Sequence, residues 1–425
     1  MEAAAHGDCQ LVPFQVRANE ALPPEFLLAA ACCSWPPSAM RDAAVRRAAG
    51  APIDWKRFLQ VLTRQRVGAL ARDGLMRAEI PVPPAATAAM ADIAKQTAVR
   101  NLQYAGEARA LRRLFDDSGV PILFFKGATL ARRAYGSIDL KHGRDIDILV
   151  SRDHVREAVG LLEQVGYRPV WPIPGSEPLF STWLDTAKEF EFLDPARGTR
   201  VELHWALVDN GWHRARLAAH LTRQAVDIGN GVVLETLGDD ILFVYLCIHG
   251  ARSGWFRLKW LADVAAILEA SSAADFDRYV ALARDCDATP CLAQAALLCG
   301  RLFPGVLSAE RAAPFRRSLR HRWLERTAMT MMTRGGGRLE VSHIPFGSFP
   351  TWVSAWLLGR SWRYLLAELR LAMTSLTDMR QAPLPRPLWF LYPLLRLPLS
   401  AVRRIKDRGL GKAPPELPAG PTGAG

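Results

Sequence analysis

Arg144-Asp-Ile-Asp-Ile-Leu-Val150 combines a short apolar run with two aspartates at alternating positions. Successive side chains of a β-strand point to opposite faces, so the run predicts a strand on which Asp145 and Asp147 share one face. Two carboxylates on one face repel each other unless a cation lies between them, and Mg²⁺ prefers such oxygen ligands. Taken alone, this pattern is also common at solvated strand ends, so its meaning depends on the neighbouring segments.

A second apolar run, Val120-Pro-Ile-Leu-Phe-Phe125, precedes it and predicts another buried strand. Lys126-Gly-Ala-Thr129 follows directly, and residues 128–135 suit a helix. The first amides of a helix favour an anion, so we expect these four residues to bind nucleotide phosphates, with Lys126 supplying a charge and Thr129 a hydroxyl. The alternative is an ordinary turn after a strand. Neither GxxxxGK[ST] nor GxGxxG occurs, which excludes the Walker and Rossmann signatures.

The third informative segment lies further along the chain and reads as a hairpin. Residues 188–193 alternate polar and apolar side chains, residues 194–199 form a turn, and residues 200–207 predict the second strand. Glu202 supplies a third carboxylate, with His204 on the same face. If this strand neighbours the Asp145 strand, the three acids can hold two metal ions, an arrangement suited to phosphoryl displacement. The alternative is an exposed strand face.

The alternation of strands and helices in the middle of the chain indicates an α/β unit, and with a hairpin added to the same sheet and helical regions on both sides we expect the α+β class for the whole chain. Helices are expected before it, including one from Asp54, which can cap its start, and a long one over residues 85–118. Helices are expected after it as well, with residues 241–249 and 258–268 the clearest. We divide the chain into a helical region (1–105), a core (106–235), a helical domain (236–345) and a C-terminal helical segment with a disordered tail (346–425).

The amino-acid composition limits the kinds of partner and the cellular compartment that we expect. The chain has 425 residues and a formal charge of +12, which favours a polyanion or an anionic membrane face as a partner, although Arg-rich composition also follows from a GC-rich genome. The seven cysteines include no CxxC pair, so we expect reduced thiols in a cytoplasmic protein rather than a zinc site or a disulfide framework. No signal peptide is recognisable, and residues 387–400 are apolar but too short to span a bilayer.

The segment after Gly335-Gly-Gly337 pairs aromatic with basic residues, and the tail from Lys412 is rich in Pro and Gly. Ordinary helical packing explains the aromatic and basic pairs, and peripheral membrane contact through residues 346–425 is the alternative. We do not expect nucleic acid to be the partner. The residues concerned are Trp352, Trp356, Arg360, Trp362, Arg363 and Tyr364.

Together these segments resemble a known group of enzymes. The runs Leu123–Ala131, Tyr135-Gly136 and Arg144–Val150 look like the DNA polymerase β-type nucleotidyltransferase superfamily. More narrowly, they resemble an uncharacterised bacterial nucleotidyltransferase family whose members carry Lys-Gly, then Asp-Ile-Asp-Leu-Leu-Val, then Leu-His-Trp. Val201-Glu-Leu-His-Trp205 matches the last motif. The similarity is firmest over residues 120–205.

The resemblance implies a small mixed sheet of nucleotidyltransferase type flanked by helical regions. It implies an NTP donor, Mg²⁺ (two ions), and transfer of a nucleoside monophosphate to an unidentified hydroxyl or phosphate on a small molecule, glycan or protein. The metal-binding and catalytic residues would be Asp145, Asp147 and Glu202. The nucleotide-binding residues would be Lys126, Gly127, Ala128, Thr129, Arg144 and His204.

Two departures from the family pattern leave room for a changed or lost activity. Ala128 stands where the superfamily has Gly or Ser, and eighteen positions separate Gly127 from Asp145. The alternative is therefore a catalytically decayed nucleotide-binding or scaffold protein, which the intact set of three acids argues against. In the helical region that follows, His249, Arg257, Lys259 and Asp263 either line the cleft or, for Lys259 and Asp263, form a pair within one helix.

Overall fold

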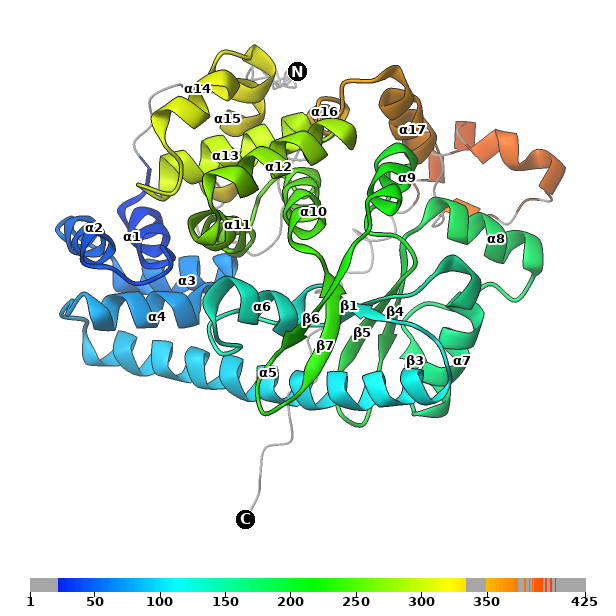
Figure 1. Cartoon of the computed structure of the whole chain (residues 1–425), viewed down its shortest axis with the longest axis horizontal. Coiled ribbons are helices and arrows are strands. Elements are labelled where there is room, and N and C mark those ends of the chain that lie inside the picture. The colour runs from blue at the N-terminus through cyan, green and yellow to red at the C-terminus, as the bar shows by residue number, and fades with distance from the viewer. Residues whose placement is uncertain are drawn as a thin grey trace, which may run out of the picture.

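The computed structural model describes residues 22–333 and 349–373, together with scattered positions between 378 and 402. Cys9, the Gly335-Gly-Gly337 break and the tail predicted to be disordered lie outside the described residues. Helices surround a small central sheet on most of its sides (Figure 1). Within the described part of the chain, every helix is too short or too polar to cross a membrane.

Five helices precede the sheet. Asp54 caps the third of them, as its position predicted, because its carboxylate accepts the backbone amides of Lys56 and Arg57 at 3.0 and 3.1 Å. The fifth helix has 34 residues and contains the predicted boundary between residues 105 and 106, so the division of the chain into units stays a prediction. The five helices are α1 (Pro24–Cys32), α2 (Ala39–Ala49), α3 (Trp55–Gln65), α4 (Gly68–Arg77) and α5 (Pro84–Asp117).

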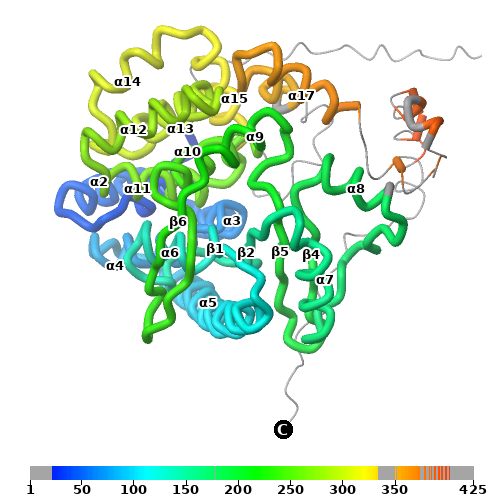
Figure 2. Tube along the Cα trace, turned by 45° about the vertical axis from the view of Figure 1, so that its right-hand side comes forward, coloured from blue at the N-terminus to red at the C-terminus, as the bar shows by residue number. Residues whose placement is uncertain are grey.

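The central sheet has five strands in the order β1-β2-β5-β4-β3. Only β2 and β5 pair in parallel, and the other neighbours are antiparallel, so the sheet is mixed. The hairpin of β4 and β5 confirms the sequence prediction, and so does the position of β5 beside β2 (Figure 2). The strands are β1 (Leu123–Phe124), β2 (Ile146–Leu149), β3 (Arg168–Pro169), β4 (Glu189–Leu193) and β5 (Arg200–His204).

The two faces of this sheet differ in polarity. One face is apolar and packs on α5 and on α7 (Val155–Gln164); in Figure 1, α5 runs below the strands and α7 lies to their right, next to β3. Strand alternation then sends the acidic side chains to the opposite face. The strands that carry the site are therefore anchored by a buried apolar layer, formed by Ile146, Ile148, Phe190, Phe192, Val201 and Leu203.

A second hairpin, β6 (Arg223–Asp227) and β7 (Val233–Leu237), was not predicted. Gly229-Asn-Gly231 is a recognisable turn signal between its strands, but β6 is mostly polar and has no buried residue, whereas β7 alternates exposed and buried residues. The remaining connections are α6 (Gly127–Tyr135), a 3₁₀ turn (Arg152–His154), α8 (Glu177–Thr186) and α9 (Gly211–Ala219).

The C-terminal half is helical, as expected, and shares its core with the beginning of the chain. One continuous cluster of buried apolar side chains runs from Phe26 in α1 through α10–α13 to Tyr364. The six described cysteines are buried free thiols. The helices are α10 (Asp239–Arg252), α11 (Leu258–Ala270), α12 (Ala273–Asp285), α13 (Thr289–Leu302), α14 (Ala309–Arg316), α15 (Leu319–Thr333), α16 (Phe349–Trp356) and α17 (Trp362–Met373), followed by a 3₁₀ turn (Arg386–Leu391).

Candidate active site

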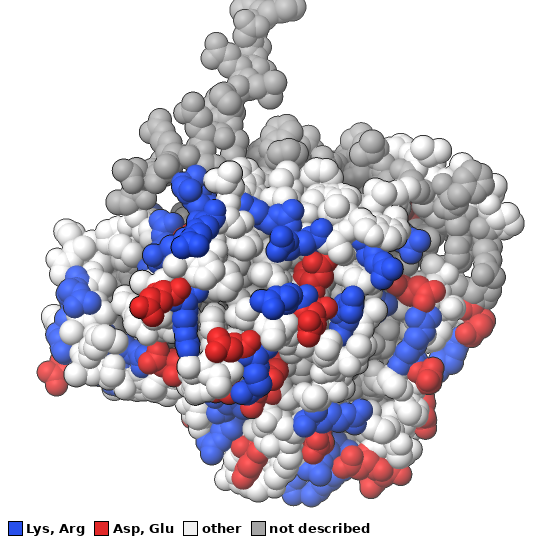
Figure 3. Space-filling view, turned by 45° about the horizontal axis from the view of Figure 1, so that its top comes forward, with Lys and Arg blue, Asp and Glu red and all other residues white. Residues whose placement is uncertain are grey.

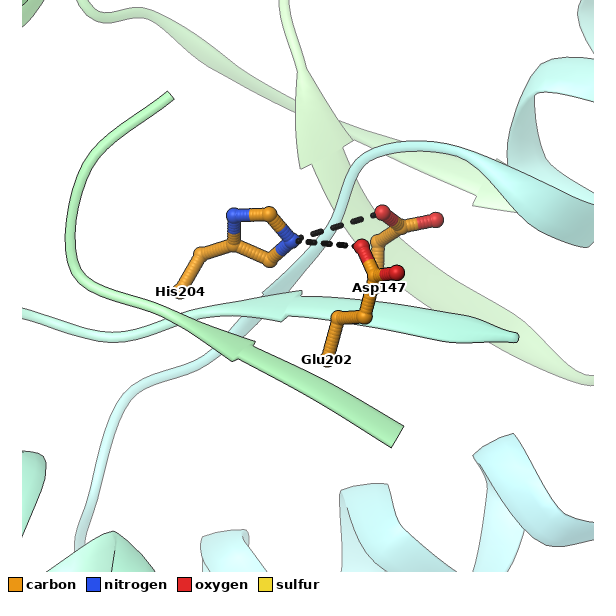
Figure 4. A group of neighbouring side chains, drawn as sticks. All are labelled: Asp147, Glu202 and His204. Atoms are coloured by element: carbon orange, nitrogen blue, oxygen red, sulfur yellow. Dashed lines mark hydrogen bonds and ion pairs between the residues drawn. The ribbon is translucent and has the colours of Figure 1, made fainter. Parts of the chain in front are cut away.

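Asp147 and Glu202 meet because β2 and β5 run in parallel with these two residues in register. His204 follows two residues later on the same face of β5, and all three side chains converge (Figure 4). The His204 Nε2 atom lies 3.4 Å from Asp147 Oδ1 and 3.3 Å from Glu202 Oε2. One potential ligand atom from each residue lies within 4.8 Å of the others, which suits a single metal ion.

Asp145, the other acid of the predicted trio, lies immediately before β2 begins at Ile146. It lines the same pocket as Asp147 but does not belong to the three-residue group around His204. The structure therefore brings Asp147 and Glu202 together, whereas Asp145 lies two residues before Asp147, just outside the N-terminal end of β2.

Lys126, the residue that caps the start of α6, faces this group. Its Nζ atom donates to Asp147 Oδ1 at 2.6 Å, and the Asp147 side chain is 1% exposed. The other carboxylate oxygen of Asp147, Oδ2, is buried and has no hydrogen-bond partner among the described residues. The carboxylate thus keeps one oxygen available for a further cation.

Gly127 starts α6 directly after Lys126. Its φ of 56° lies in the left-handed region, where a side chain is strained, although an added Cβ would meet no atom closer than the Asp145 carbonyl oxygen at 3.8 Å. Glycine is required here by backbone conformation and not by crowding. The turn exposes the first amides of α6 to a pocket that Lys126, Asp145 and Asp147 also line.

Charge compensation shapes the ionisation of the group. Burial opposes the charge on Asp147, but Lys126 and then His204 outweigh it and hold its pKa well below the usual range. Burial, followed by repulsion from Asp147, raises the pKa of Glu202 to about 7 despite the contact with His204. Burial and Asp147 also raise the pKa of Asp145. The carboxylates of Asp145, Asp147 and Glu202 therefore repel one another, and a bound cation would offset this repulsion.

Glu189 is a fourth acid of the site that the sequence analysis missed. It lies opposite His204 in the β4–β5 register, and its Oε2 atom is 3.1 Å from His204 Nε2. It also forms an ion pair with Lys188. The alternation of residues 188–193 identified the strand but could not show that Glu189 would face a histidine of the next strand.

The other predicted nucleotide ligands lie close by but differ in what they offer. Ala128 and Thr129 line the pocket, and the Thr129 hydroxyl donates to the Phe124 carbonyl at 2.9 Å, which fixes the junction of β1 and α6. Arg144 is exposed beside Asp145, and its carbonyl accepts the Tyr104 hydroxyl at 2.6 Å. The nucleotide-binding roles of these residues stay predictions, and that of Thr129 would require its hydrogen bond to Phe124 to break.

The predicted pair between Lys259 and Asp263 within one helix is wrong. Asp263 accepts from Lys141 at 2.6 Å and from Tyr135 at 3.0 Å, which ties α11 to α6 and to the loop after it. Lys259 instead donates to the carbonyl of His142 at 3.4 Å. Sequence spacing could not reveal Lys141 as a partner, since 122 positions separate it from Asp263.

Arg257 and His249 also fall outside the residues that line the described pocket. The Arg257 side chain donates to the carbonyl of Arg64 at 2.7 Å, where it joins α11 to α3. His249 packs against Tyr245 and Trp260 with ring centroids 5.8 and 5.3 Å apart. These two residues serve the packing of helices around the site.

Comparison with known proteins agrees with the geometry. A family model described as an uncharacterised nucleotidyltransferase matches residues 51–304, which is more than half of the chain. The matched range contains every residue of the group around Asp147. No curated protein matches the sequence.

Proposed function

Because this chain belongs to the uncharacterised nucleotidyltransferase family, we propose that it transfers a nucleoside monophosphate from an NTP to an unidentified acceptor. The observation that carries the proposal is the parallel register of Asp147 with Glu202, which joins two carboxylates and His204 beside the start of α6. The wider assignment to the DNA polymerase β-type superfamily belongs to the same proposal.

The donor set fits a divalent cation. Asp147 and Glu202 offer oxygen atoms, His204 offers a nitrogen atom, and Asp147 Oδ2 is buried without a partner among the described residues. A buried carboxylate oxygen of this kind is costly unless a cation or donor reaches it. When bound, the ion would offset the negative charge that develops during phosphoryl transfer. Asp145 remains a proposed additional ligand, and Mg²⁺, with two ions, remains the proposed cofactor.

The other residues have complementary proposed roles. The first amides of α6 and the ammonium group of Lys126 would hold the triphosphate, because both attract anions. An acceptor hydroxyl or phosphate oxygen would form a bond to the α-phosphorus while the bond to the β-phosphate oxygen breaks, so pyrophosphate leaves. The acceptor's proton, where there is one, would pass to solvent or to a carboxylate of the site.

A decayed binding protein is the second candidate, favoured by Ala128 and by the ion pair of Lys126 with Asp147, which fills one oxygen of the metal site. The two candidates differ in one measurable respect. A binding protein would be stabilised by the nucleotide but would release no pyrophosphate.

The proposal is tested by the shift in unfolding temperature with each of four NTPs and Mg²⁺, together with pyrophosphate release. A ligand at 100 times its Kd adds about 2.7 kcal/mol of stability. The double variant Asp147→Asn/Glu202→Gln should lose a metal-dependent shift that the wild type shows. Asp153→Asn/Glu157→Gln is the matched control, because it removes two exposed acids beyond the apolar face of the sheet. If no NTP produces a shift that requires these acids, the donor-binding site is wrong.

A further inference from the structure

One side of α17 carries a stripe of exposed apolar side chains. They lie three, four, seven and eleven residues after Trp362, a spacing that places them along a single face of a helix. Their exposed fractions, between 39% and 68%, are high for large apolar groups. We call this set the α17 stripe: Trp362 (68%), Leu365 (40%), Leu366 (39%), Leu369 (44%) and Met373 (40%).

The opposite side of α17 holds the helix in this orientation. Tyr364 and Glu368 are buried, with 0% and 6% exposure. Glu368 accepts from Asn210 at 3.0 Å and from Arg252 at 2.6 Å, and Tyr364 packs on His213 with ring centroids 4.7 Å apart. The apolar stripe is therefore fixed outward by buried polar contacts on the far side of the helix.

Basic side chains flank the stripe. Arg363 and Arg370 are exposed, lie two helical turns apart, and form no ion pair with any described residue. Residues 349–412 contain eleven Lys and Arg but only three Asp and Glu, which accounts for +8 of the formal charge of +12. The two acids among them that the structure describes, Glu368 and Asp378, are buried. The exposed charges that the structure describes on α17, Arg363 and Arg370, are therefore all positive.

The stripe is part of a wider concentration of exposed apolar groups. Among the described residues, twenty large apolar side chains are exposed, and nine of them lie between positions 352 and 402. Elsewhere such residues are scattered, which is normal for a protein surface. On the face shown in Figure 3, basic side chains gather in the upper part, whereas acidic and basic groups alternate below.

We propose that α17 docks on an anionic membrane surface, with the α17 stripe in the interfacial layer and Arg363 and Arg370 near the lipid phosphates. A helix with Trp and Leu on one face and Arg beside it binds in the plane of such an interface. Each basic group near an anionic leaflet adds attraction. Nucleic acid is the weaker candidate, because leucine and methionine side chains offer it neither stacking nor charge. This proposal does not depend on the proposed transferase activity.

The experiment is flotation of the full chain with vesicles of phosphatidylcholine alone or with 30% phosphatidylglycerol. We expect binding to the anionic vesicles only, and a decrease in bound fraction as salt rises. Leu365→Gln/Leu369→Gln should reduce the affinity at least tenfold, because these two residues belong to the stripe. Arg363→Gln/Arg370→Gln should remove the preference for anionic lipid.

Met76→Gln/Leu102→Gln is the matched control, because Met76 and Leu102 are exposed apolar residues (60% and 57%) on α4 and α5. It should bind vesicles like the wild type. Unfolding temperatures of all variants show whether a loss reflects misfolding. Absence of binding, equal binding to neutral vesicles, or an equal loss in the control would overturn the proposal. Tight binding of a 20-nucleotide RNA that the stripe variants weaken, with no vesicle binding, would replace it with a nucleic-acid surface.

Discussion

Lys126 and Asp147 form an ion pair of 2.6 Å inside the candidate site, and it joins the start of α6 to β2. Burial by itself would lower the pKa of Lys126, but the attraction of the Asp147 carboxylate is stronger and raises this pKa well above its usual range. The lysine ammonium thus neutralises a carboxylate that is also a proposed metal ligand. Cation binding and the ion pair are therefore expected to compete for Asp147.

Removing this lysine should destabilise the protein in a way that a divalent cation repairs. We expect Lys126→Met to lower the free energy of unfolding by about 3 kcal/mol, because the buried carboxylate of Asp147 keeps only the longer contact with His204. Millimolar Mg²⁺ should restore more stability to the variant than to the wild type. Urea denaturation with and without Mg²⁺ measures both effects. Lys188→Met is the control, and its partner Glu189 is more exposed, so a loss under about 1 kcal/mol is expected.

Loss of the His204 imidazole should weaken the binding of some metal ions more than that of others. An imidazole nitrogen favours Co²⁺ over Mg²⁺, which prefers oxygen ligands. We expect His204→Gln to weaken Co²⁺ binding about tenfold, as loss of a ligand or its support commonly does, and Mg²⁺ binding by less. Titration calorimetry of both ions gives the ratio. An equal loss for both would mean that His204 acts only by orienting the carboxylates.

Gly127 should resist substitution because of its backbone conformation. At a φ of 56°, Gly127→Ala should cost about 1–2 kcal/mol of stability and weaken triphosphate binding at the start of α6. Gly106 offers a matched control within α5, where an added Cβ meets nothing within 4 Å. Gly106→Ala should stabilise the protein by about 0.5–1 kcal/mol. Thermal unfolding of both variants checks the opposite signs, and equal effects would refute the backbone argument.

Protonation of His213 should make the free energy of unfolding decrease as the pH falls. Burial lowers its pKa from the ordinary 6.5 to about 4, against the opposing effect of its contact with the Asp287 carbonyl. The unfolded chain then binds the proton first, so the free energy of unfolding decreases as pH falls below about 6.5 and continues to decrease until about 4.

In His213→Phe, we expect the loss of stability between pH 7.5 and 5.5 to be smaller than in the wild type by about 1 kcal/mol. Urea unfolding at several pH values measures this difference. Parallel stability curves for the two proteins would show that His213 does not titrate in this range.

Much of the architecture followed from local patterns. The apolar runs at 120–125 and 145–150, the alternation at 188–193 and the cap at Asp54 each depend on neighbouring residues, and each produced the expected element. The β6–β7 hairpin was missed although β7 alternates exposed and buried residues, because its partner β6 is mostly polar and has no buried residue, so no apolar pattern marks the first strand of the pair.

The candidate site was less predictable because it depends on pairing between distant strands. The sequence identified Asp147 and Glu202, and the parallel register that joins them appears only in the folded sheet. Glu189 was missed, and Asp263 was assigned to the wrong lysine, since both find their partners on other elements. Periodicity shows which face a side chain takes, whereas ion pairs between elements require the tertiary arrangement.

The parallel pairing of β2 with β5 also determines when the site can form. A parallel neighbour cannot be joined by a tight turn, and here fifty residues, including β3 and β4, lie between the two strands. During synthesis, Lys126 and Asp147 leave the ribosome well before Glu202 and His204. A chain interrupted before residue 202 therefore contains Lys126 and Asp147 but neither Glu202 nor His204, and the carboxylates of the two strands come together only in a non-local step of folding.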